Sequence, residues 1–207
     1  MTIYHFLEMI KVAICGGIGS GKSTVCRMFE ERGVAVYESD ARAKALMNES
    51  AEVREALVAE FGEECYLDGT LNRPYLASKV FGSEEQLARL NAIVHPAVKS
   101  DFLAWAEEQE GDYCILETAI LFESGFDKFV DNTVAVLAPQ PLRVMRAMER
   151  DGATKEQIEA RIKVQMSDDE LMRRCDFAIV NIHLEDVEKD VAELAYRFKV
   201  LANEQSR

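Results

Sequence analysis

The sequence predicts an α/β fold, a five-stranded parallel sheet with helices on both faces, and three observations support it. Short, largely apolar runs recur along the chain, as expected for strands that are covered on both sides. Helix-compatible segments separate these runs, which favours right-handed crossover connections. The chain has 207 residues, of which 48% are hydrophobic, enough for one domain with a full core and a smaller lobe.

The elements of the predicted core follow one another in a regular order. Helices are predicted over Ser23–Arg32, Gln140–Arg150 and Lys155–Met166, and Thr154 with Gln157 forms a capping box before the last of them. The five strand candidates are Lys11–Cys15, Val34–Tyr37, Tyr113–Thr118, Thr133–Leu137 and Phe177–Val180.

A helical lobe is predicted between the second and third strands, and no strand is expected between Asp40 and Glu110. Its helices are Ala41–Met47, Glu52–Phe61, Arg73–Phe81, Glu84–Val94 and Pro96–Glu110. Pro96 suits the first turn of its helix. We therefore expect a single domain over residues 1–207, with a core of residues 9–40 and 111–207, a lid at about 140–166 and a substrate-binding lobe at 41–110.

The most informative motif is the stretch GGIGSGKST at residues 16–24. It fits the phosphate-binding loop pattern G-x-x-x-x-G-K-[ST], with an apolar strand before it and a helix after it. The alternative, a glycine-rich turn with a solvated lysine, does not explain that context. The motif therefore predicts a three-layer fold of the P-loop nucleoside-triphosphate hydrolase class, with helical acceptor lobe and helical lid.

The spacing of this loop has a chemical reason. Glycines let backbone N–H groups reach the oxygens of a polyphosphate, and the following helix points its positive end at the anion. Lys22 is expected at the β- and γ-phosphates, and the Ser23 hydroxyl is expected to ligate Mg²⁺. The loop residues expected to bind ATP are Gly17, Gly19, Ser20, Gly21, Lys22, Ser23 and Thr24.

Carboxylates follow two of the predicted strands, where open α/β sheets bind ligands. Asp40 comes just after the second strand, where it either accepts the proton of an attacking hydroxyl or caps the next helix. Spacing alone favours neither role. Glu117 ends the third strand and is expected to hold Mg²⁺ through a water molecule. No N-K-x-D motif is present, which disfavours a regulatory GTPase.

Composition excludes several other classes. The net charge of −13 disfavours nucleic-acid binding, although residues 143–174 hold eight Lys/Arg and seven Asp/Glu and suit a small polyanion. Five scattered cysteines without a C-x-x-C pair indicate reduced thiols in a cytoplasmic protein and no structural zinc. No apolar run could cross a membrane, and residues 1–8 are expected to be a short extension rather than a secretory signal.

Beyond these motifs, the chain resembles the dephospho-CoA kinase family from Met9 to about Val191. The resemblance includes the phosphate loop, the acidic pair Glu38 and Asp40, and His95-Pro96. Its further segments are FG (61–62), LDGTLNR (67–73), VFGSEEQLARLNAIVHP (80–96), LFESG (121–125), ERDGATKEQIEARIKVQ (149–165) and CDFAIVN (175–181).

The resemblance implies a reaction in which ATP phosphorylates the ribose 3′-hydroxyl of dephospho-CoA to give coenzyme A and ADP. It implies Asp40 as the base, Arg73 and His95 in the acceptor lobe, and Asn181 near the adenine of ATP. Arg146, Arg150 and Arg161 would belong to the lid, with Arg150 taking part in catalysis. A solvated helix face remains open for each arginine, a helix cap for His95 and a strand-ending turn for Asn181.

This chain departs from the usual family pattern at three points. Glu117-Thr118-Ala119 stands where a different acidic residue and a proline are usual, and Glu38 replaces the first Asp of a D-x-D. Cys15 replaces a threonine before the loop.

Two alternatives to the implied activity are another small-molecule kinase and a nucleotide-dependent binding protein without an acceptor.

Overall fold

The computed structural model describes residues 9–205 of the chain, so the extension expected at residues 1–8 lies outside the described residues. Contacts divide the described residues into two compact units, residues 9–37 with 106–205 and residues 38–105. Each unit is described separately below. Within residues 9–205, no helix combines the length and the apolar character needed to cross a membrane.

A five-stranded sheet forms the centre of the first unit, and it confirms the predicted fold class. The strand order is β2-β5-β1-β6-β7, and β1 pairs in parallel with both β5 and β6. β7 is parallel to β6 at one edge. The strands are β1 (Ile10–Cys15), β2 (Val36–Glu38), β5 (Tyr113–Glu117), β6 (Asn132–Leu137) and β7 (Phe177–Val180).

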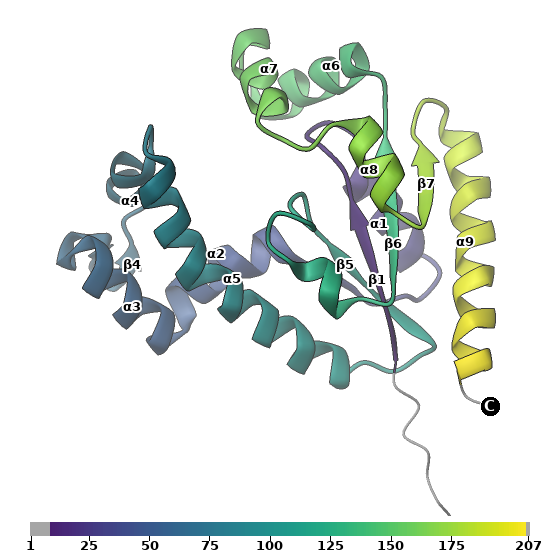
Figure 1. Cartoon of the computed structure of the whole chain (residues 1–207), viewed down its shortest axis with the longest axis horizontal. Coiled ribbons are helices and arrows are strands. Elements are labelled where there is room, and N and C mark those ends of the chain that lie inside the picture. The colour runs from purple at the N-terminus through teal and green to yellow at the C-terminus, as the bar shows by residue number, and fades with distance from the viewer. Residues whose placement is uncertain (1–8, 206–207) are drawn as a thin grey trace, which may run out of the picture. The chain divides into compact units, whose positions relative to one another are not determined.

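The core forms between this sheet and two helices, α1 (Lys22–Glu30) and α9 (Leu184–Gln205). Figure 1 shows α9 running along the sheet beside β7. Tyr113 lies between two aromatic rings of the core, with its centroid 6.4 Å from that of Phe29 and 5.4 Å from that of Phe198. Burying these large apolar surfaces supplies the main driving force for folding.

Three further helices follow β6. They are α6 (Gln140–Asp151), α7 (Lys155–Lys163) and α8 (Asp168–Arg174), and Figure 1 shows α6 and α7 beyond the carboxyl ends of the strands. Gly152 ends α6 in the left-handed conformation with φ of 63°, a common helix stop. The predicted capping box of Thr154 and Gln157 is present at the start of α7.

The second unit is largely helical. Its helices are α2 (Ser39–Glu49), α3 (Ala51–Phe61), α4 (Arg73–Val80) and α5 (Glu84–Glu107), with short 3₁₀ turn η1 (Glu63–Cys65). Another 3₁₀ turn, η2 (Phe126–Phe129), belongs to the first unit. Leu57, Phe61 and Leu76 belong to a buried hydrophobic cluster whose residues all lie in the second unit. This unit therefore has a core that does not depend on the sheet.

The expectation of no strand between Asp40 and Glu110 is wrong. β3 (Tyr66–Leu67) and β4 (Thr70–Leu71) form an antiparallel hairpin. Its two turn residues, Asp68 and Gly69, both have positive φ, 49° and 82°. Asp-Gly is the pair preferred in two-residue hairpin turns, because the turn requires positive φ at both positions.

The division of residues 84–110 into two helices is also wrong. α5 runs unbroken from Glu84 to Glu107 with Pro96 inside it, although an interior proline costs about 3 kcal/mol. Val94, Val98 and Phe102 are buried on both sides of the proline. Burial of these side chains offsets the lost backbone hydrogen bond. Two further helices, α8 and α9, are present in segments for which no element was predicted.

We predict that Phe198→Ala lowers the free energy of unfolding by about 3–5 kcal/mol, the usual cost of removing a buried phenylalanine. Phe198 is fully buried and its ring lies against Tyr113 and Phe177. Urea unfolding would measure the loss. Tyr196→Ala on the same helix is the matched control, because Tyr196 is 72% exposed. Equal losses for both variants would contradict the packing of α9.

Candidate active site

The phosphate loop connects the central strand β1 to helix α1. β1 ends at Cys15 and α1 begins at Lys22, with Gly21 as its N-cap at φ of 96°. At Gly16 the backbone has φ of 154°, and a Cβ there would lie only 2.4 Å from the Val136 carbonyl oxygen. Glycine is therefore required at Gly16 both for the conformation and for the space.

The Lys22 side chain lies over the loop that it follows. Its Nζ donates a hydrogen bond of 2.9 Å to the Gly16 carbonyl oxygen and lies 3.6 Å from Glu117 Oε1. Both side chains are only 12–13% exposed. Because Glu117 ends β5, directly beside β1, the structure brings these two predicted site residues together at the carboxyl edge of the sheet.

The tip of the loop, Ile18, is held by two side chains from distant parts of the chain. Its N–H donates to Gln165 Oε1 at 2.8 Å, and its carbonyl accepts from Arg143 Nε at 3.0 Å. The Ile18 side chain packs against a cluster that includes Val144 and Ile158 of α6 and α7. Main chain and side chain of Ile18 are thus both anchored to the predicted lid segment.

Arg143 is a buried cation, only 4% exposed. Its Nη1 donates to Asp168 Oδ1 at 2.7 Å, which supplies the opposite charge that a buried guanidinium needs. The remaining nitrogen, Nη2, has no hydrogen-bond partner within the described residues. It lies against Gly17, where a Cβ would come within 1.9 Å of it. Gly17 does not have positive φ, so a side chain at this position would be opposed only by lack of space, and the Arg143 guanidinium would have to move.

A second anchor holds the loop at Ser20. Asn181 follows β7, and its Nδ2 donates to the Ser20 carbonyl oxygen at 2.9 Å. Arg146 of α6 in turn donates to the Asn181 carbonyl at 3.1 Å and contacts Asn181 Oδ1 at 3.4 Å. Arg146 and Asn181, both predicted to bind ATP, therefore also fix the loop. The Ser20 hydroxyl is buried and unpartnered among the described residues.

The other two predicted lid arginines share one carboxylate. Arg150 donates to Asp151 through Nε at 2.7 Å and Nη2 at 3.2 Å, and Arg161 donates to Asp151 Oδ2 at 3.1 Å. The hydrogen bonds from Arg150 lower the pKa of the Asp151 carboxyl. Both arginine side chains are more than half exposed, so their guanidinium groups remain accessible to a ligand.

The predicted acceptor residues belong to the second unit. Asp40 is exposed in the first turn of α2, and the helix cap is Glu38, so the alternative of Asp40 as N-cap is wrong. Arg73 is exposed at the first position of α4. His95 lies inside α5 rather than at a helix start, so its capping role is wrong as well, and burial lowers its pKa.

One ion pair organises this part of the second unit. Arg42 of α2 makes two hydrogen bonds to Asp101 of α5, at 2.9 and 2.8 Å. Such a bidentate pair fixes orientation as well as distance. It therefore ties the first half of α2, which carries Asp40, to the helix that carries His95.

Oxygen donors are available for a hard cation beside Lys22. Ser23 is exposed in the first turn of α1, and the Glu117 carboxylate lies at the adjacent strand end. Within residues 9–205 no group of three or more His, Cys, Asp or Glu could hold a metal ion by itself. This set of one hydroxyl and one carboxylate fits Mg²⁺, which usually keeps several waters and shares its ligands with phosphates.

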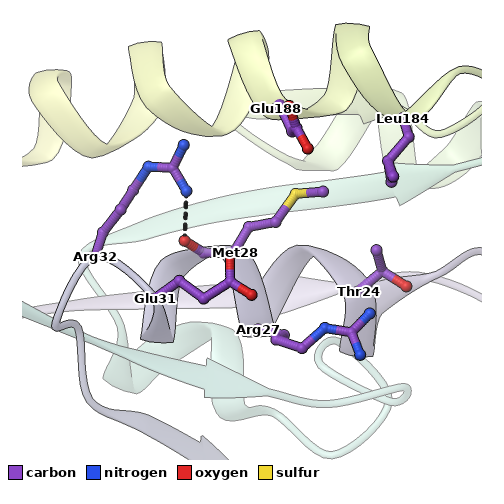
Figure 2. Close-up of a pocket in the computed structure, with 7 residues that line it drawn as sticks. All are labelled: Thr24, Arg27, Met28, Glu31, Arg32, Leu184 and Glu188. Carbon is purple, nitrogen blue, oxygen red and sulfur yellow. Dashed lines mark hydrogen bonds between the residues drawn. The ribbon is translucent and has the colours of Figure 1, made fainter.

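A polar groove of about 370 Å³ lies between α1 and the start of α9. Figure 2 shows Thr24 and Leu184 at one end of it and Arg32 at the other. Arg32 is tied back to the Met28 carbonyl by a hydrogen bond of 2.6 Å. The groove therefore begins at a loop residue that we expect near the inner phosphates of ATP.

Arg143 and Gln165 contact the phosphate loop, and neither is among the residues predicted from the sequence to lie at the site. The two lie 125 and 147 residues from Ile18 along the chain, and no local pattern connects them to the loop. The only available signal was the arginine content of α6, which drew attention to Arg146 and Arg150 instead.

Comparison with known proteins gives consistent results. A family model described as dephospho-CoA kinase matches residues 10–186. The chain is 43% identical to a dephospho-CoA kinase of Porphyromonas gingivalis, covering 84% of this chain and 86% of the relative. It is 44% identical to that of Salinibacter ruber, covering 90% and 96%. A crystal structure from Thermus thermophilus has a TM-score of 0.83 at 32% identity, covering 92% and 97%.

We predict that Gly17→Ala weakens MgADP binding about tenfold, equivalent to about 1.4 kcal/mol, because the new methyl group displaces Arg143 from beneath the loop. Calorimetric titration would measure the dissociation constant. In an Arg143→Ala background the same substitution should cost much less, since the clash is gone. An equal cost in both backgrounds would show that Arg143 is not what excludes a side chain at Gly17.

Proposed function

The chain belongs to the dephospho-CoA kinase family, and from this premise we propose that it transfers the γ-phosphoryl group of ATP to the ribose 3′-hydroxyl of dephospho-CoA. The products are coenzyme A and ADP. Its substrates are therefore small molecules, and ATP use follows from membership of a kinase family.

One observation of the fold carries this proposal. Lys22 follows a phosphate loop at the carboxyl end of the central strand, with its ammonium between the Gly16 carbonyl and Glu117. A cation and a helix N-terminus at that position stabilise charge on the phosphates during transfer. The arrangement supports phosphoryl transfer, and membership of the family supplies the acceptor.

In the proposed reaction Asp40 accepts the proton of the 3′-hydroxyl as the hydroxyl oxygen attacks the γ-phosphorus, and ADP leaves. An exposed carboxylate with no capping duty in α2 suits this role. Arg73 and His95 would contact dephospho-CoA in the second unit. The other ATP contacts would come from Arg146, from Asn181 at the adenine, and from the loop residues Gly17, Gly19, Ser20, Gly21, Lys22, Ser23 and Thr24.

Arg150 and Arg161 would contact the phosphates of ATP by exchanging partners. Each now donates to Asp151, and a phosphate oxygen offers the same acceptor geometry with more charge. The exchange would expose the Asp151 carboxylate to solvent, and hydration would then stabilise its charge. Arg150 would then stabilise charge that develops in the transition state, which is the reason to expect it among the catalytic residues.

We also propose that Mg²⁺ accompanies ATP, held by the Ser23 hydroxyl and, through water, by Glu117. When bound, the cation neutralises the charge of the phosphate oxygens. Glu117 would also position Lys22 without the metal, since its carboxylate and the Gly16 carbonyl both contact the Lys22 ammonium.

The proposal predicts ADP release that depends on dephospho-CoA. A coupled assay should show rapid ADP formation with dephospho-CoA and only slow hydrolysis without it. Lys22→Ala is the control, and it should nearly abolish turnover because the transferred charge is no longer neutralised. Preferential phosphorylation of a nucleoside would favour another small-molecule kinase. Slow hydrolysis that dephospho-CoA leaves unchanged would favour a nucleotide-binding protein.

Asp40→Asn should lower kcat by about 10²–10⁴-fold, the contribution of a general base, while MgATP affinity changes little. The amide keeps the size of the side chain but cannot accept the proton. Steady-state kinetics and nucleotide titration would separate the two effects, and Asp68→Asn in the hairpin turn serves as a control in the same unit. Lost ATP binding with a high residual rate would assign Asp40 to the nucleotide instead.

A further inference from the structure

Two cysteines that are 160 residues apart in the chain meet beside the phosphate loop. Cys15 Sγ and Cys175 Sγ are 3.5 Å apart, so the sulfur atoms are in direct contact. Cys15 is the last residue of β1 and is only 1% exposed. Cys175 directly follows α8 and is partly exposed, so a small solute can reach one member of the pair.

Several bonds fix Cys175 in this position. Its N–H donates to the Leu171 carbonyl at 2.9 Å and ends α8. The next residue, Asp176, accepts from the Thr133 backbone N–H at 2.8 Å and from its hydroxyl at 2.7 Å. Asp176 N–H also donates to Thr133 Oγ1 at 3.0 Å. The Cys175 thiol is therefore held against the sheet and does not meet Cys15 by chance.

We propose that Cys15 and Cys175 are a modification site, at which a hydroperoxide such as hydrogen peroxide converts the thiol pair into a disulfide and thereby weakens nucleotide binding. The nucleotide part rests on the proposed function, whereas formation of the bond does not. Only one small movement is needed, because the sulfurs must approach from 3.5 Å to about 2.05 Å.

The chemistry follows from the unequal protonation of the two thiols. The hydrogen bond from Cys15 lowers the pKa of Cys175, and its bond with Cys175 together with burial raises the pKa of Cys15. Cys175 is thus the thiol that ionises more readily and the more exposed of the two, and its thiolate form is the nucleophile. Its sulfur attacks the peroxide, taking one oxygen as sulfenic acid and releasing hydroxide. Cys15 then attacks that sulfur, and its proton leaves with the sulfenic oxygen as water.

Both ends of the new bond are connected to the phosphate loop. Cys15 directly precedes Gly16, and the Gly16 carbonyl accepts the hydrogen bond from Lys22. Gly16 is also closely packed, since even a Cβ atom on it would collide with Val136 and Ser20. Cys175 ends the helix that begins at Asp168, the partner of Arg143. Drawing the sulfurs together by about 1.5 Å therefore pulls on Gly16 directly and on Ile18 through Arg143.

The experiment uses the whole chain in its reduced form, treated with hydrogen peroxide and then digested without reductant. Mass spectrometry should identify a peptide pair joined through Cys15 and Cys175, with two of the five thiols lost. The dissociation constant for MgADP should rise about tenfold or more, and dithiothreitol should restore it. Circular dichroism before and after oxidation excludes unfolding as the cause.

Matched variants make the test specific. Cys15→Thr removes the buried thiol at the end of β1 and should bind MgADP normally before and after peroxide. Cys175→Ser should be equally insensitive, while Cys114→Ala, which removes a buried thiol of β5, should stay sensitive.

Two results would overturn the proposal. If peroxide oxidises the protein and no Cys15–Cys175 disulfide forms, the proposed modification site is wrong. If the disulfide forms and the MgADP affinity is unchanged, the proposed effect on the loop is wrong. A reduced protein that does not bind MgADP would count against the proposed function instead. Peptide mapping would still decide whether the disulfide forms.

Discussion

A phosphate loop can bind an anion through backbone N–H groups only if its peptide groups are held in place before the anion arrives. Here that constraint is met by hydrogen bonds from outside the loop. Arg143 and Gln165 fix the Ile18 peptide, and Asn181 fixes the Ser20 carbonyl. These side chains come from α6, from the segment after α7 and from the end of β7. The loop is therefore held by three segments that are distant from it in the sequence. Preorganisation of this kind avoids the cost of ordering the loop at each binding event.

The local parts of the structure could be predicted because their signals are local. The glycine spacing of residues 16–21, the apolar runs of the strands and the Thr154 capping box all act within a few residues. Two misses were avoidable by the same reasoning. Asp68-Gly69 is a strong hairpin signal, and α9 has apolar residues at helical spacing, namely Val187, Val191, Leu194, Ala195, Phe198, Leu201 and Ala202.

The remaining features depend on contacts that sequence spacing does not show. The helix break expected at Pro96 is absent because buried residues on both sides keep α5 continuous. Arg143 resembles any other arginine of α6 until the fold places it under Gly17. The Cys15–Cys175 contact also requires β1 and the end of α8 to meet. All three features depend on tertiary contacts, and in α5 those contacts override a local preference.

The charge of residues 143–174 shows how a count of residues can mislead. Residues 143–174 hold eight basic side chains, which suggests a cationic surface. Most of those charges are already matched, Arg143 by Asp168, Lys155 by Glu159, Arg173 by Glu170, and both Arg150 and Arg161 by Asp151. The N-terminus of α1 attracts a polyphosphate without such a partner, since α1's first turn carries no acidic side chain, whereas Lys22 is itself paired with Glu117. Asp151 holds two guanidinium groups, those of Arg150 and Arg161, so a ligand that displaced its carboxylate would free both positive charges at once.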